Sequence, residues 1–304
     1  MRADCKRAPV SATMTTMSQP KFVFFGGEPL GMPALEALKA AQLLPTLIVA
    51  NPDRPVGRKQ VLTPPPVKTW ADKHGIPTLQ PESYKDRAAL APLTETSFDL
   101  FVVVAYNHIL PQWLIELPQH QTINLHPSLL PKWRGASPIR SAILADERVT
   151  GVTIMLLDTK MDHGPILSQE VIEIPASDWP MAGPKLDTKL AEHGAALLAA
   201  TISEWVAGTI EPQEQDHEAA TYCGKITKDM AELPFDPFNL PQGEAAHQTL
   251  LKIQAYAGWP VAFFIHEGKR YKITAAHRAA DGRLVIDSVI PEGKKEMSFT
   301  SVFS

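Results

Sequence analysis

The sequence predicts an α/β fold, with a doubly wound domain followed by a smaller β domain. Two observations lead to this prediction. Short apolar runs alternate with helical periodicity from Lys21 to about residue 208, and short strands separated by glycine turns occupy the C-terminal part. The length of 304 residues suits two domains better than one. A hydrophobic share of 44% and a charged share of 20% exclude a disordered chain.

The first domain should contain six strands, each read from a short apolar run, at residues 21–27, 45–52, 99–107, 122–126, 150–158 and 166–174. Residues 33–41 have helical spacing. A longer helix near the end of this domain is predicted because apolar side chains recur on one face, at Leu186, Leu190, Leu197, Leu198, Ile202 and Trp205.

The chain then becomes polar and rich in proline, which indicates a linker. Beyond it we expect a helix over 242–255 and strands at 261–266, 269–277 and 283–290, forming a small β-barrel or sheet. The predicted organisation is therefore a disordered extension at 1–20, a catalytic domain at 21–208, a linker at 209–225 and a C-terminal domain at 226–304.

The two cysteines, Cys5 and Cys223, lie far apart and belong to no metal-binding motif, so we expect reduced thiols, no metal and a cytoplasmic monomer. No apolar stretch reaches the ~20 residues that a membrane span needs. The leader carries basic and hydroxyl side chains without an apolar core, which leaves a mitochondrial transit peptide as an alternative.

The first candidate site lies in the run "INLHPSLLPKWRGASPI" at residues 123–139. Asn124 and His126 are two residues apart, so on an extended strand they face the same side. Asp162 follows a later strand, and in a parallel sheet both loops would open at the same edge. An amide, an imidazole and a carboxylate at one point suit acyl transfer through an oxyanion, without a serine or cysteine nucleophile.

The second candidate site is the basic, proline-rich segment 51–68, which contains Arg54, Arg58, Lys59 and Lys68. It is either a solvated connection or a loop that binds phosphates or an anionic cofactor. The glycine run after the first strand lacks the spacing of a dinucleotide or phosphate loop, so it indicates a plain turn into a helix.

These motifs resemble the family of 10-formyltetrahydrofolate-dependent formyltransferases. The resemblance rests on Asn124-x-His126, on "SLLPKWRG" and on Asp162 placed 36 residues after His126. Within that family, "PDRPxGR…PxPVK", "ATYCGKITK", "YAGWP" and "PEGKKEM" are similar to the members that formylate methionyl-initiator-tRNA. The similarity extends over about residues 21–297.

The resemblance implies a Rossmann-like formyltransferase domain joined to an OB-like, tRNA-binding barrel. It implies direct attack by the amino group of methionyl-initiator-tRNA on 10-formyltetrahydrofolate through a tetrahedral intermediate. Asn124 and His126 would stabilise the oxyanion, while Asp162 would orient His126 and help to move the proton. The folate would contact two segments, Val104, Ala105, Tyr106 and Asn107 together with Ser128, Leu129, Leu130 and Pro131. The tRNA would contact Arg54, Arg58, Lys59 and Lys68.

Two other functions stay open at this point. An amino-sugar N-formyltransferase would use the same chemistry, but the basic segment and the second domain argue against it. A nucleic-acid-binding protein without catalysis would not need Asn124, His126 and Asp162 together. The chain also departs from the family pattern at Asn107, where a glycine is usual, which puts a side chain beside the expected folate pocket.

Overall fold

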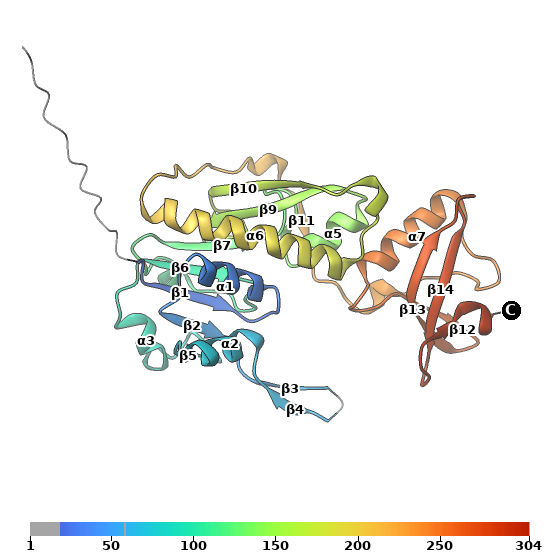
Figure 1. Cartoon of the computed structure of the whole chain (residues 1–304), viewed down its shortest axis with the longest axis horizontal. Coiled ribbons are helices and arrows are strands. Elements are labelled where there is room, and N and C mark those ends of the chain that lie inside the picture. The colour runs from blue at the N-terminus through green and yellow to red at the C-terminus, as the bar shows by residue number, and fades with distance from the viewer. Residues whose placement is uncertain (1–18, 58, 304) are drawn as a thin grey trace, which may run out of the picture.

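The computed structural model describes residues 19–57 and 59–303. A seven-stranded mixed sheet forms the N-terminal domain, and a four-stranded antiparallel sheet forms the C-terminal one (Figure 1). The large sheet has the order β10-β9-β7-β6-β1-β2-β5. Its strands are β1 Phe22–Gly26, β2 Leu47–Ala50, β5 Thr78–Leu79, β6 Leu100–Val104, β7 Thr122–His126, β9 Val149–Leu156 and β10 Ile166–Glu173. The α/β fold class and all six strands expected from the sequence are confirmed, and β5 is an additional short strand.

The strand directions differ in one respect from the prediction. β7, β6, β1, β2 and β5 are parallel, but β9 runs antiparallel to β7, with Leu156 opposite Ile123. The end of β9 therefore lies beside the beginning of β7 rather than beside His126. The expectation that Asp162 opens at a shared carboxyl edge is wrong, because that rule holds only for parallel neighbours.

Helices cover both faces of the large sheet, and each face has its own apolar core. One core joins the sheet to α1, α2 and α6, and the other joins it to α3 and α4. The helices of this domain are α1 Gly31–Ala40, α2 Pro66–His74, α3 Ala91–Thr94, α4 Gln112–Ile115, α5 Pro138–Leu144 and α6 Gly183–Val206, with short 3-10 turns η1 Ala88–Leu90 and η2 Ala176–Asp178. The predicted long helix is α6, and among the described helices none is both long and apolar enough for a bilayer.

The basic segment, residues 51–68, forms a β-hairpin and the start of a helix instead of a long loop. β3 Arg54–Val56 and β4 Val61–Thr63 form a hairpin that projects from the sheet domain (Figure 1), and α2 begins at Pro66. Proline suits this position because its fixed φ matches a helix start and it has no N–H to leave unsatisfied. Every described residue of β3 and β4 is exposed.

The C-terminal domain packs α7 Gly243–Ala255 against a sheet of order β12-β13-β14-β15. The strands are β12 Phe263–His266, β13 Lys269–Arg278, β14 Leu284–Pro291 and β15 Met297–Ser298, followed by η5 Phe299–Ser301. The apolar cluster of this domain continues into α5 and α6 through Ile143 and Leu190. The two sheets therefore share one core, and α7 contacts α5, the helix that follows the proline-rich loop after β7.

The predicted linker also packs against the first domain. It contains η3 His217–Ala219 and β11 Tyr222–Cys223, and η4 Asp229–Ala231 follows it. β11 pairs in parallel with β8, the short strand Arg134–Gly135 inside the proline-rich loop. The connection between the domains thus crosses the region of the candidate site.

Candidate active site

Asn124 and His126 lie on the same face of β7, as the spacing predicts. Leu125 between them packs toward α6, where a β-carbon added at Gly194 would lie 2.9 Å from its Cδ1. Asn124 lies opposite Val103, whose side chain belongs to the core on the other face. His126 is 5% exposed, whereas Asn124 is only half-buried. The amide is therefore the more accessible of the two groups.

The stiff loop after β7 holds the imidazole. His126 Nε2 lies 2.9 Å from the carbonyl oxygen of Trp133, and because a carbonyl only accepts, Nε2 carries a proton. The hydroxyl of Ser128, which is buried, donates to the carbonyl of Lys132 at 2.6 Å. Thr153 on β9 donates to the carbonyl of Ser128 at 2.7 Å. These bonds leave Nδ1 as the ring nitrogen that faces the remainder of the site.

Asp162 reaches this nitrogen from the loop between β9 and β10. Its Oδ1 lies 3.7 Å from His126 Nδ1, an ion-pair distance that exceeds a hydrogen bond. Its Oδ2 accepts a hydrogen bond of 2.8 Å from the backbone N–H of Gly135. The structure therefore brings Asp162 and His126 together as expected, by a loop that folds back over the sheet face and not by a shared edge.

Three contributors to this geometry were not among the site residues predicted from the sequence. They are the Trp133 carbonyl, the Gly135 amide and the side chain of Arg134, which is 1% exposed. Gly135 has a φ of +119°, a backbone conformation that needs glycine. Glycine after a Trp-Arg pair hints at this turn, but nothing in a single sequence indicates that the arginine is buried.

The thiol of Cys223 lies in the same region, on the strand that pairs with β8. Burial raises the pKa of this thiol, and the negative charge of Asp162 raises it further, although hydrogen bonds from Ser137 and Ser141 act in the opposite direction. The thiol is therefore a poor nucleophile at neutral pH, since the reactive form is the thiolate.

The first predicted folate segment leaves β6 directly beside β7. Val104 lies opposite Leu125, and its side chain is in the core. The carbonyl of Ala105 accepts hydrogen bonds from the backbone of Gly27 and Glu28, in the turn after β1. Asn107 donates from its side chain to the carboxylate of Glu28. This segment thus lies where the strand order reverses, between β6 and β1, which is where open α/β sheets bind ligands.

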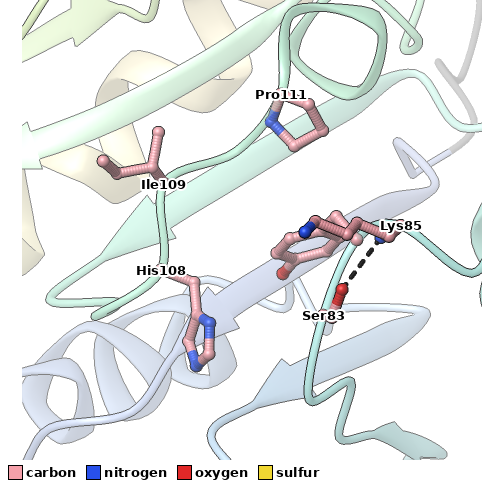
Figure 2. A pocket seen from close by; sticks show the side chains of 6 residues that line it. Ser83, Lys85, His108, Ile109 and Pro111 are labelled. Carbon is pink, nitrogen blue, oxygen red and sulfur yellow. Dashed lines mark hydrogen bonds between the residues drawn. The ribbon is translucent and has the colours of Figure 1, made fainter.

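A cavity of about 390 Å³ opens next to this segment (Figure 2), lined by Ser83, Tyr84, Lys85, His108, Ile109 and Pro111. The hydroxyls of Tyr84 and Tyr106 lie 2.7 Å apart, and burial raises the pKa of both phenols. Ile109 is 89% exposed, so a large apolar side chain at this cavity is in contact with solvent. The lining offers an apolar surface and one ammonium group, Lys85.

The second predicted folate segment has a different environment. Ser128 and Leu130 are buried, and the Leu130 carbonyl accepts a hydrogen bond from the side chain of Gln169. Leu129 and Pro131 line a separate cavity of about 360 Å³, whose other lining residues are Lys132, Trp133, Glu147, Val149, Thr150 and Ala219. No residue of the first predicted segment, 104–107, lines this second cavity.

The basic residues of the hairpin region fall into two groups. Lys68 is half-buried on α2, and its ammonium donates to Asp53 and to the side chain of Gln80 at 2.7–3.1 Å. Hydrogen bonds from Gln80 and then from Lys68 lower the pKa of Asp53. Lys59 is exposed at the hairpin tip, and Arg54 forms an exposed ion pair of 2.9 Å with Glu82. Arg58 lies outside the described residues.

In the part of the chain that the structure describes, no three His, Cys, Asp or Glu side chains are grouped so that they could hold a metal ion. The groups at the site are instead an amide, an imidazole, a carboxylate and backbone amides. This set can bind a developing oxyanion and accept a proton.

Residues 21–201 match the family model described as Formyl transferase, in agreement with the sheet and the groups at this site. The protein is therefore a formyl transferase by class. The curated methionyl-tRNA formyltransferase of Halalkalibacterium halodurans is 42% identical over 260 residues, which are 86% of this chain and 79% of that relative. The methionyl-tRNA formyltransferase of Listeria innocua is 36% identical over 307 residues, covering 93% of this chain and 95% of the relative. The chain belongs to the methionyl-tRNA formyltransferase family.

Solved structures support the fold. An N-formyltransferase from Helicobacter canadensis, in complex with folinic acid and dTDP-3-aminofucose, has a TM-score of 0.61 at 16% identity, covering 92% of this chain and all of the other. HypX from Aquifex aeolicus, in complex with tetrahydrofolic acid, has a TM-score of 0.61 at 14% identity, covering 94% of this chain and 47% of HypX.

Proposed function

We propose that this chain transfers the formyl group of 10-formyltetrahydrofolate to the amino group of methionyl-initiator-tRNA. The nitrogen of the methionyl group forms a bond to the formyl carbon, and the bond from that carbon to N10 of the folate then breaks. The observation that carries the proposal is the His126 and Asp162 pair at the end of β7, beside the half-buried Asn124. The identity to curated methionyl-tRNA formyltransferases supports the choice of substrate.

Asn124 and His126 act on the oxyanion that forms when the carbonyl is attacked. The side chain of Asn124 makes no hydrogen bond to any residue that the structure describes, so its amide is available as a donor. His126 acts through Nδ1, because its Nε2–H is bonded to the Trp133 carbonyl, and it donates from Nδ1 as the doubly protonated ring beside the Asp162 carboxylate. Two donors on one strand face need no reorganisation during the reaction, and this preorganisation is the main source of such stabilisation.

Asp162 orients His126 and, through a water molecule, accepts the proton that the methionyl nitrogen loses as this amine bonds to the formyl carbon; N10 of the folate takes up a proton as its bond to that carbon breaks. The 3.7 Å separation from Nδ1 leaves the carboxylate in electrostatic contact without a direct hydrogen bond. Catalytic hydrogen bonds are often long before substrates bind and shorten in the complex. The Gly135 N–H on the other carboxylate oxygen keeps Asp162 from rotating away.

The folate fits the end of β6 better than the loop after β7. The cavity at Ile109 combines an exposed apolar side chain and the ring of Tyr84, which suit a pterin and a benzoyl ring, with Lys85, which suits a terminal carboxylate. We therefore assign the folate to Val104–Asn107 and to this cavity. Ser128–Pro131 then serve to hold His126, since Ser128 and Leu130 are buried and bonded within the protein.

The tRNA contacts the hairpin and the C-terminal domain, residues 226–304. Lys59 stands exposed at the hairpin tip, and the exposed ion pair of Arg54 costs little to exchange for a phosphate. Lys68 has its three ammonium protons occupied by Asp53 and Gln80, so we assign it to anchoring the base of the hairpin.

The deciding experiment incubates the full chain with 10-formyltetrahydrofolate and either methionyl-initiator-tRNA or a nucleotide-linked amino sugar. Mass spectrometry of the acceptor should find formylmethionine and no formylated sugar. The same reaction with Asp162→Asn should be at least about a hundredfold slower, while folate binding stays within about twofold. Formylation of the sugar alone would overturn the proposal.

A further inference from the structure

The segment that connects the two domains lies against the loop that carries Asp162. The backbone of Gln213 pairs with Ile166 in both directions, at 2.7 and 2.8 Å. Two residues later, the side chain of Gln215 is buried against the same loop. After two more, the ring of His217 stacks on His163 with centroids 4.0 Å apart. The segment is thus fixed to the start of β10 by the backbone of Gln213, and the side chains of Gln215 and His217 contact the loop that carries Asp162.

Gln215 uses every hydrogen-bonding position of its side-chain amide. Its Nε2 donates to the carbonyl of Asp162 at 3.0 Å and to the carbonyl of Gly164 at 2.7 Å. Its Oε1 accepts from two nitrogens of Arg134, at 3.1 and 2.7 Å. An amide has two donors and two acceptor positions, so none is left over. A side chain that is 5% exposed and fully bonded has a defined position.

Arg134 joins this amide to the loop that holds His126. Its guanidinium is buried, and the partners that it contacts are Gln215, the Tyr222 hydroxyl at 3.3 Å and His217 Nδ1 at 2.9 Å. The next residue, Gly135, donates its N–H to the carboxylate of Asp162. Asp162 is therefore held twice, at its carboxylate through Gly135 and at its own carbonyl through Gln215.

The backbone of Asp162 needs such support. Its φ is +48°, in the left-handed region that non-glycine residues seldom occupy. A residue in this region keeps its conformation only when its surroundings impose it. Without the two donors of Gln215, the carbonyls of Asp162 and Gly164 lose their described partners and the loop can relax.

We propose that Gln215 is a positioning residue, which with the buried Arg134 holds the Asp162 loop against His126. The segment between the domains thereby completes the catalytic centre. This inference rests on the proposed function only in taking Asp162 as the group that moves the proton.

The test uses the full chain with Gln215→Glu and a matched control, Gln213→Glu. The first change keeps the shape of the side chain and its contact with Arg134, but removes both donors to the loop. The control makes the same chemical change on an exposed side chain two residues away. Gln215→Asn is a third variant, which retains the donors on a shorter side chain and should recover part of the lost activity.

Hydrogen exchange measures how often the backbone of the Asp162 loop opens, and it requires no substrate. We expect the backbone amides of residues 157–166 to exchange on the order of tenfold faster in Gln215→Glu than in the wild type or in Gln213→Glu, while residues 47–50 of β2 stay unchanged. Equal exchange at 157–166 in the three proteins would overturn the inference, whatever the reaction of the enzyme is.

Kinetics then measure the catalytic consequence. Gln215→Glu should lower kcat about a hundredfold and change the KM of either substrate by less than about threefold, because a misplaced group affects the transition state. In an Asp162→Asn background the same substitution should cost far less, since both changes act on one unit. An undiminished loss in that background would overturn the positioning role. A wild type that leaves methionyl-tRNA unformylated would contradict the proposed function alone, because the exchange result stands apart from it.

Discussion

Replacement of Gly135 by alanine should disrupt the pairing of β8 with β11. The φ of +119° at this position is unfavourable for any residue with a β-carbon. The new methyl group would also overlap the carbonyl oxygen of Cys223. β11 must therefore move away, which removes the bonds from Arg134 N–H to Thr221 and from Ala136 N–H to Cys223, of 2.9 and 3.2 Å.

The magnitude follows from these two effects. Backbone strain at such a position costs about 1–3 kcal/mol, and two lost hydrogen bonds cost about 1 kcal/mol each. The free energy of unfolding should fall by about 3–5 kcal/mol in urea denaturation. Because the Gly135 N–H also bonds to Asp162, the formyl-transfer rate of the remaining folded protein should fall about a hundredfold.

Gly224→Ala is the matched control for this prediction. Gly224 directly follows β11, has no positive φ, and a β-carbon added there would meet nothing within 4 Å. We expect its stability to stay within about 0.5 kcal/mol of the wild type. The reasoning is refuted if Gly135→Ala unfolds at the same urea concentration as Gly224→Ala and has equal activity.

Three further predictions address the site, the hairpin and the domain contact. Asn124→Ala should lower kcat about 10²–10³-fold with an unchanged melting temperature, whereas Asn239→Ala, on an exposed turn, should match the wild type. Lys59→Ala should weaken tRNA binding and flatten its dependence on salt, measured by filter binding, without a change in folate affinity. Asp146 accepts hydrogen bonds from Trp179 and from His247 of α7. Burial alone would raise the pKa of Asp146, but these bonds and the nearby positive charges lower it overall. A lowered pKa stabilises the fold above the ordinary value of about 3.9, so Asp146→Asn should lower the melting temperature slightly between pH 5 and 8, and the difference should vanish as the pH falls below about 4.

Local patterns predicted most of the secondary structure, because each element depends on nearby residues. The buried runs became β1, β2, β6 and β7, and the apolar spacing of the long helix reappears in the buried face of α6. The period of two on β7 also predicted that Asn124 and His126 share a face, since alternation follows from strand geometry alone.

Some positions depend on neighbours that are distant in the chain. Lys68 was expected to meet tRNA, yet the fold puts Asp53 and Gln80 around its ammonium. The segments at 104–107 and 128–131 were expected to share the folate pocket, and Leu129 and Pro131 line a cavity that includes no residue of 104–107. No local pattern encodes which side chains fill the space around a given group, so these outcomes require the packed structure.

The sequence by itself determined most of the elements, the family and the common strand face of Asn124 and His126, because strand alternation and short motifs are local properties. Only the tertiary structure decided that β9 runs against β7, and hence that Asp162 reaches His126 by a loop folded across the sheet. It also decided that Gln215, 53 residues from Asp162 in the chain, bonds to the carbonyl of that residue. Such contacts arise from the closing of long loops around a common core, and residues far apart in sequence meet only when that core forms.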